Sequence, residues 1–195
     1  ELHGDDATIT GTGVISGSNV GDHDKWYGKR TPQPAIDVEK TDSGVYDTGK
    51  GNDSDQANNV KNDHDTATTA ANLKVGQTTE IDFNFTNVGN ETLVNLKPVD
   101  ETISGQVDVT KIAYTYKGKS LTLDQQGYFM LNGKRLELPV GDSIKGKGTL
   151  PSLKAGEVHG DKVTITGVGK FSKKTVKDHD NWYGKTPSAT PTTPS

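Results

Sequence analysis

Apolar and polar residues alternate along several short stretches of the chain. The pattern is clearest in residues 79–86 (TEIDFNFT), 111–116 (KIAYTY) and 162–166 (KVTIT). A period of two residues is typical of strands with one buried face. No stretch shows the 3.6-residue period of an amphipathic helix. The pattern therefore predicts an all-β protein.

Turn-forming residues separate these predicted strands. Glycine lies within residues 88–90, 117–119, 132–133 and 140–142. The Asn-Gly pair at 132–133 is a preferred turn of two-residue β-hairpins, so residues 127–138 are expected to form an extra hairpin. Because short loops join the strands without β-α-β alternation, we expect an antiparallel, immunoglobulin-like β-sandwich of about seven strands.

An internal repeat recurs with an offset of 156 residues. Residues 1–29 and 157–185 align without a gap and are identical at 18 of 29 positions. An offset of this size is that of a whole domain. We expect residues 1–29 to be the C-terminal strand and exit motif of a preceding repeat, and residues 30–185 to be one complete repeat. Residues 186–195 form a Thr/Pro/Ser-rich linker.

The composition excludes several classes of function. The net charge is -4 and no long basic run is present, so a nucleic-acid partner is not expected. The chain contains no run of about 18 apolar residues, so a membrane-spanning helix is not expected. The chain has no Cys, so disulfides cannot rigidify it, and bound calcium or other internal cross-links become the candidates for that role. No motif frames a nucleophile, so we expect no enzyme activity.

A long acidic loop separates the first predicted strand, residues 35–40, from the second, which starts near Val75. In a sandwich this loop, the end of the third strand and the exit of the last strand reach one pole. Alternating carboxylates there match the six to eight oxygen ligands of calcium. The predicted ligands are Asp53, Asp55, Asp63, Asp65, Asp100, Asp178 and Asp180, with Asp22 and Asp24 in the preceding copy.

The same acidic residues have a simpler interpretation. Asp and Asn are common in solvated turns because their side chains cap backbone groups. Neither loop matches the calcium-binding EF-hand pattern. The chain has five His residues, which could bind zinc. It has no Cys, however, and Asp residues lie next to several of the His residues, so zinc is less expected than calcium. Calcium ligands and solvated turns both remain open at this stage.

A Trp-Tyr pair occurs in both copies of the repeat. Trp26 and Trp182 are each followed by Tyr near the end of a copy, where they are expected to pack against the next repeat. The alternative is a carbohydrate- or host-matrix-binding module, because exposed aromatic rings stack on sugars. The candidate residues for that role are Trp182, Tyr183, Tyr128 and Phe129.

Several motifs resemble a known family. Residues 34–40 (PAIDVEK), 85–93 (FTNVGNETL) and 178–184 (DHDNWYG) resemble, in order, motifs of the immunoglobulin-like conserved repeats of bacterial surface proteins known as domain of unknown function eleven. The resemblance covers most of residues 34–185 and departs from the family in the acidic loop and in residues 104–138. It implies a stalk repeat of a Gram-positive adhesin, extracellular and attached to the cell wall.

This resemblance and the acidic loop together predict a function. We expect a stalk repeat stiffened by calcium at its C-terminal pole or at the joint between repeats. Its partners would be neighbouring repeats, and the parent adhesin would bind a host or matrix ligand. Lys40 also suggests an intramolecular Lys-Asn isopeptide bond, as in some pilin and adhesin domains. The last strand is expected at residues 163–169 and offers no Asn or Asp partner, which argues against the bond.

Overall fold

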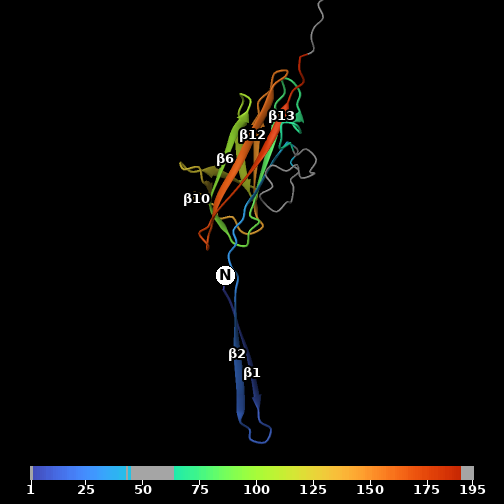
Figure 1. The fold of residues 1–195 in the computed structure, drawn as a ribbon. Coiled ribbons are helices and arrows are strands. Elements are labelled where there is room, and N and C mark those ends of the chain that lie inside the picture. Colours follow the sequence, from blue (N-terminus) through green and yellow to red (C-terminus); the bar gives the residue numbers. More distant parts are fainter. Residues whose placement is uncertain (1, 43, 45–63, 190–195) are drawn as a thin grey trace, which may run out of the picture. The chain divides into compact units, whose positions relative to one another are not determined.

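The computed structural model describes residues 2–42, 44 and 64–189, and the chain divides into two units. The units are Glu1–Pro32 and Gln33–Ser195. The described residues form strands and no helix (Figure 1). No helix that could span a membrane is therefore found among them.

The first unit is a β-hairpin of strands β1 (Leu2–Thr12) and β2 (Asn19–Lys29). The strands pair antiparallel, from Leu2 opposite Lys29 to Thr12 opposite Asn19. Gly13 N–H donates to the Ser18 carbonyl at 2.8 Å within the connecting turn. The single C-terminal strand predicted for this segment is therefore two paired strands.

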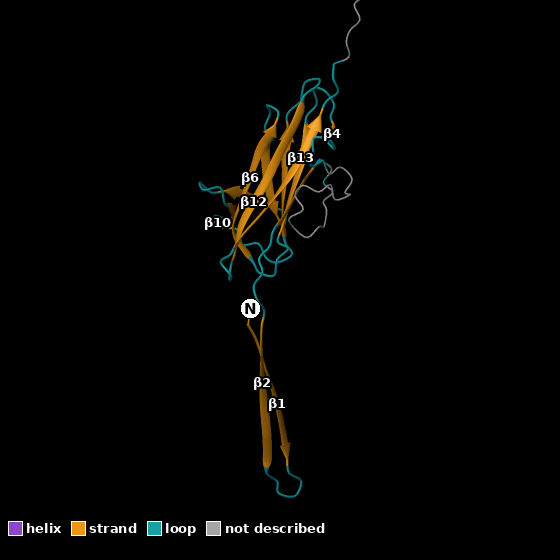
Figure 2. Ribbon diagram, in the orientation of Figure 1, coloured by secondary structure: helices purple, strands orange, loops and turns teal. Residues whose placement is uncertain are grey.

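The second unit is a sandwich of two sheets (Figure 2). The order in one sheet is β10-β9-β8-β7-β11-β5-β3, and in the other β4-β13-β12-β6. The strands are β3 (Asp37–Thr41), β4 (Ala71–Asn72), β5 (Thr79–Thr86), β6 (Leu93–Ser104), β7 (Thr110–Tyr116), β8 (Lys119–Leu123), β9 (Phe129–Leu131), β10 (Lys134–Arg135), β11 (Ser143–Leu150), β12 (Val158–Gly169) and β13 (Thr175–Lys185).

The topology is that of an immunoglobulin fold. Strands β3, β5, β11 and β7 lie side by side in the order A-B-E-D, and β6, β12 and β13 in the order C-F-G. The predicted all-β, antiparallel, immunoglobulin-like sandwich is confirmed. The two-residue strand β4 pairs in parallel with β13 at the edge of the second sheet.

The extra hairpin predicted at residues 127–138 is present as β9 and β10. Arg135 pairs with Met130 and Lys134 with Leu131. The turn residues Asn132 and Gly133 have φ values of 51° and 77°, as a type I′ turn requires. Strand β8 links this hairpin to β7, which extends the first sheet beyond the four strands A, B, E and D.

An aromatic cluster fills the space between the sheets. The rings of Tyr114 and Phe129 lie 4.9 Å apart, and Phe85 lies within about 6 Å of both. Phe83 and Trp182 are fully buried in the same core. These residues alternate with outward-facing polar residues, which explains the two-residue period of the sequence.

The internal repeat is visible as two hairpins with one register. Asp161 pairs with Trp182 across β12 and β13, and the equivalent Asp5 pairs with Trp26 across β1 and β2. Burial differs: Trp182, which faces the other sheet of its own sandwich, is 0% exposed, whereas Trp26 is 64% exposed.

Candidate functional site

A buried lysine lies between the two sheets of the sandwich. Lys40, on β3, is 1% exposed and ranks among the largest fully buried side chains. A buried ammonium group is costly unless charged and polar partners surround it. The identity of those partners therefore decides what this part of the molecule can do.

Two carboxylates from the opposite sheet contact this lysine. Lys40 Nζ lies 2.5 Å from Asp100 Oδ1 on β6 and 2.7 Å from Asp161 Oδ1 on β12. Asp100 is opposite Val163, two residues along β12 from Asp161, so the two carboxylates are diagonal neighbours on one face of the sheet. The Phe83 ring centroid, on β5, lies 4.9 Å from Nζ and closes the other side.

A histidine holds the second of these carboxylates. His159 precedes Asp161 by two residues on β12, so both side chains point into the sandwich. His159 Nε2 lies 3.0 Å from Asp161 Oδ2, and both side chains are 0% exposed. The ring of His159 lies 6.2 Å from that of Trp182. We name Lys40, Asp100, Asp161 and His159 the lysine cluster.

The charges of the lysine cluster perturb one another. Burial raises the pKa of Asp100 to about 6; the charge of Lys40 opposes this shift and that of Asp161 adds to it. Burial also raises the pKa of the neighbouring Tyr114 hydroxyl, and the charge of Asp100 contributes to that increase. Asp100 can therefore gain and lose a proton close to neutral pH.

Two further buried carboxylates join the sheets next to the cluster. Val38 N–H donates to Asp178 Oδ2 at 2.9 Å, and Lys40 N–H donates to Asp180 Oδ2 at 2.6 Å. Strand β3 is the last strand of its sheet, so these backbone groups have no partner strand on that side. The side chains of β13 supply the missing acceptors and tie the first strand of the sandwich to the last.

This arrangement corrects the expected geometry of the calcium ligands. Asp178 and Asp180 lie within β13 and point into the sandwich, instead of occupying an exit loop. Asp100 contacts an ammonium group, which a calcium ion beside it would repel. These three aspartates therefore do not fit a shared calcium site. The described residues contain no group of three or more His, Asp or Glu placed to hold a metal ion.

The other predicted ligands are separate from this cluster. Asp22 and Asp24 are exposed on β2, where each accepts a 2.9 Å hydrogen bond from the next backbone N–H. Asp65 is buried at the described end of the acidic loop. Asp53, Asp55 and Asp63 lie outside the described residues.

The described end of the acidic loop returns beside β13. Tyr183 N–H donates to the His64 carbonyl at 2.8 Å, and the His64 ring meets the Trp182 ring edge-on at 6.4 Å. His64 Nε2 lies 3.9 Å from Asp42 Oδ1. Burial raises the pKa of Asp42, and the charge of His64 opposes this shift. His64 is thus part of the packing between the loop and β13.

The aromatic candidates do not form an exposed platform. Trp182 and Phe129 are 0% and 1% exposed and belong to the core of their own sandwich. This placement differs from both expectations, a contact with the next repeat and a sugar-binding surface. Tyr183 is half-buried, and the half-buried Tyr128 has the guanidinium of Arg135 4.1 Å from its ring centroid.

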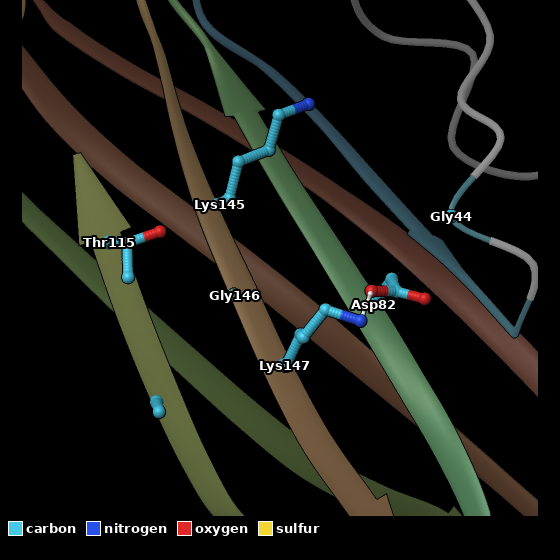
Figure 3. Close-up of a pocket in the computed structure, with 7 residues that line it drawn as sticks. Gly44, Asp82, Thr115, Lys145, Gly146 and Lys147 are labelled. Atoms are coloured by element: carbon cyan, nitrogen blue, oxygen red, sulfur yellow. Dashed lines mark ion pairs between the residues drawn. The ribbon is translucent and has the colours of Figure 1, made fainter. Parts of the chain in front are cut away.

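A surface pocket of about 620 Å³ lies over strands β5, β7 and β11 (Figure 3). Its wall includes Asp82, Thr115, Lys145 and Lys147, which alternate with inward-facing residues of the same strands. Lys147 Nζ is 3.1 Å from Asp82 Oδ1 and also pairs with Glu80. The pocket is thus on the outer face of the sheet, opposite the lysine cluster.

The sequence-based interpretation missed the lysine cluster because it began β12 too late. The strand starts at Val158, so it includes Asp161, whereas alternation of apolar residues is visible only from Lys162 onward. A signal was nevertheless present. His159 and Asp161 are identical to His3 and Asp5 in the other copy of the repeat.

No family model and no curated protein matches this chain. Among solved structures it is similar to the CooA pilin subunit from enterotoxigenic Escherichia coli, with a TM-score of 0.34 and 12% identity over 78% of this chain and 99% of that one. It is also similar to a PapD-like domain of human CEP192, with a TM-score of 0.35 and 10% identity over 62% and 80%. A third similarity is to AvmM, which catalyses macrocyclization in alchivemycin A biosynthesis, with a TM-score of 0.38 and 11% identity over 63% and 86%. Likenesses at this level assign the chain neither a family nor a function.

Proposed function

We propose that this chain is a structural repeat of an extracellular stalk, in which successive immunoglobulin-like sandwiches space a surface protein from its cell. The observation that carries the proposal is the duplicated hairpin. Strands β1 and β2 repeat the sequence and the register of β12 and β13, the closing hairpin of the sandwich. A closing hairpin followed by a complete sandwich is the pattern of domains in tandem.

The connection between the terminal strands of the sandwich supports a mechanical role. In a tandem array, tension enters each sandwich through its first strand, β3, and leaves through its last, β13. Asp178 and Asp180 on β13 accept hydrogen bonds from the backbone of β3, and both carboxylates are buried. Pulling the two ends apart must therefore break buried, charge-assisted hydrogen bonds.

The finer parts of the proposal come from the sequence. Attachment to a Gram-positive cell wall and membership of the family named above rest on the motifs of residues 34–40, 85–93 and 178–184. Calcium binding would rest on the carboxylates of the acidic loop, Asp53, Asp55, Asp63 and Asp65, since Asp100, Asp178 and Asp180 contact Lys40 or the backbone of β3.

Surface labelling of cells from the source organism tests the proposal. Antibodies raised against the purified chain are expected to bind intact cells, and an antibody against an intracellular protein controls for leakage. Labelling that appears only after permeabilisation would contradict a surface stalk. Glycan and matrix-protein arrays test the alternative function, which requires binding that is weakened by Tyr128→Ala or Tyr183→Ala.

A further inference from the structure

The lysine cluster is set up for a reaction as well as for an ion pair. Its amine and two carboxyl groups are in contact inside a sandwich, and Lys40 and Asp161 have no exposed side-chain surface. The two carboxylates share the single ammonium of Lys40, and a carboxylate without a full counter-charge is costly in a protein interior. Binding of a proton removes the charge of such a carboxylate. Burial raises the pKa of Asp100 to about 6, which favours binding of the proton.

We propose that Lys40 and Asp161 form an intramolecular isopeptide bond, which joins Nζ on β3 to Cγ on β12. The inference stands on the geometry of the lysine cluster and does not depend on a role in a stalk. This proposal reverses the expectation from the sequence. The last strand was expected at residues 163–169, which contain no carboxyl partner for Lys40. Asp161 is that partner, because the strand begins at Val158.

The two carboxyl groups differ in how they meet the amine. Lys40 Nζ makes a hydrogen bond to Asp100 Oδ1. At 2.7 Å from Asp161 Oδ1 the same amine lies outside hydrogen-bond geometry, so this oxygen accepts no hydrogen bond. The Asp161 carboxyl is also held through Oδ2 by His159. These contacts assign Asp161 as the group attacked and Asp100 as the proton relay.

The condensation balances without an outside reagent. A protonated Lys40 transfers a proton to the Asp161 carboxylate, and the neutral amine attacks Cγ of the resulting acid. The N–C bond forms, a C–O bond of the carboxyl breaks, and that oxygen leaves as water. Asp100 passes the remaining proton from the nitrogen to the leaving oxygen, so Asp100 ends in the state in which it began.

The sandwich favours this reaction by position and by burial. Holding the two reacting groups in contact replaces a bimolecular encounter, an effect that reaches effective concentrations of about 10⁵–10⁸ M in well-oriented systems. The product also replaces a buried ammonium and a buried carboxylate by a neutral amide, which removes the cost of burying two charges.

Mass spectrometry of the intact, unmodified chain is the deciding measurement. The mass is expected to be lower than that of the sequence by one water molecule. Cyclisation of Glu1 or of an aspartate also removes water, so protease digestion must then locate a branched peptide that contains residues 40 and 161. A full mass with separate peptides overturns the proposal, and so does water loss mapped elsewhere. A branch between residues 40 and 100 overturns the assignment of Asp161.

Variants test the roles of the individual groups. Lys40→Met and Asp161→Ala are expected to restore the full mass, whereas Asp5→Ala, the exposed equivalent in the first hairpin, should keep the bond. Asp100→Asn should yield folded chain of full mass, because loss of a proton relay commonly slows a reaction by about 10²–10⁴-fold. Full cross-linking in Asp100→Asn overturns the relay. If a variant does not fold, the peptide map of the unmodified chain still decides on the bond.

Discussion

At the scale of single residues, the sandwich keeps charged groups in its core by giving each one a partner. Asp178 and Asp180 accept backbone N–H groups, and Lys40 contacts two carboxylates. A buried donor that loses its acceptor costs the full desolvation energy of the group. The contribution of these aspartates to stability should therefore exceed that of exposed aspartates.

Replacing either buried aspartate of β13 tests this argument. Asp178→Ala and Asp180→Ala are each expected to lower the free energy of unfolding by about 1–3 kcal/mol, because a buried N–H of β3 loses its acceptor. The matched exposed changes Asp22→Ala and Asp24→Ala should stay within about 0.5 kcal/mol of the unmodified chain. Urea denaturation measures all four, and equal effects in the two pairs would contradict the bridging role.

Asp100 should impose a characteristic pH dependence on stability. Its pKa is raised from 3.8 to about 6 in the folded state, so the folded state binds the proton more tightly than the unfolded state. The stability contributed by this group is present below pH 3.8 and is lost as the pH rises through about 6. In chain that mass spectrometry shows to be uncross-linked, denaturation between pH 4 and pH 7 should show this loss, and Asp100→Asn should remove it. An unchanged pH profile in the variant would argue against the raised pKa.

At the scale of strands, one hairpin occurs twice, so the burial of equivalent residues can be compared between the two copies. Ile165 on β12 is 0% exposed and the equivalent Ile9 on β1 is 73% exposed, although the pairing registers are the same. The hairpin alone therefore does not bury its apolar face. Burial requires the facing sheet that contains β3, β5 and β11.

The two isoleucines should respond differently to truncation. Ile165→Ala is expected to cost about 2–5 kcal/mol, because it leaves a cavity in the core. Ile9→Ala should change the free energy of unfolding of the sandwich by less than about 0.5 kcal/mol. Parallel denaturation curves measure both, and a large effect of Ile9→Ala would show that the first hairpin is covered in solution.

At the scale of the whole molecule, calcium would act through the acidic loop. Binding to the folded state alone stabilises it by about 2.7 kcal/mol at a hundredfold excess over Kd. Thermal unfolding is therefore expected at a higher midpoint in calcium than in EDTA, with magnesium as the control. Asp63→Asn should reduce the shift and Asp22→Asn should not. An equal midpoint in calcium and EDTA would leave the loop as a solvated turn.

Much of the fold could be predicted from local pattern. The alternation of residues 79–86 coincides with β5, and the Asn-Gly turn correctly predicts the hairpin of β9 and β10. Strand β13 was missed for a physical reason. Its inward-facing side chains include Asp178 and Asp180 as well as Trp182, so its buried face does not look apolar. Acidic residues that are buried as hydrogen-bond acceptors were interpreted as metal ligands.

The amino-acid pattern is sufficient to predict strands with an alternating apolar face, such as β5, the turn between β9 and β10 and the duplication of one hairpin, because these features depend on local periodicity and on neighbouring residues. The role of the duplicated residues depends on the packing of the two sheets. Asp5 is exposed on β1, whereas its equivalent Asp161 is buried against Lys40, 121 positions away along the chain. The packing of a second sheet turns a solvated carboxylate into a desolvated partner of an amine, and no local pattern encodes that contact.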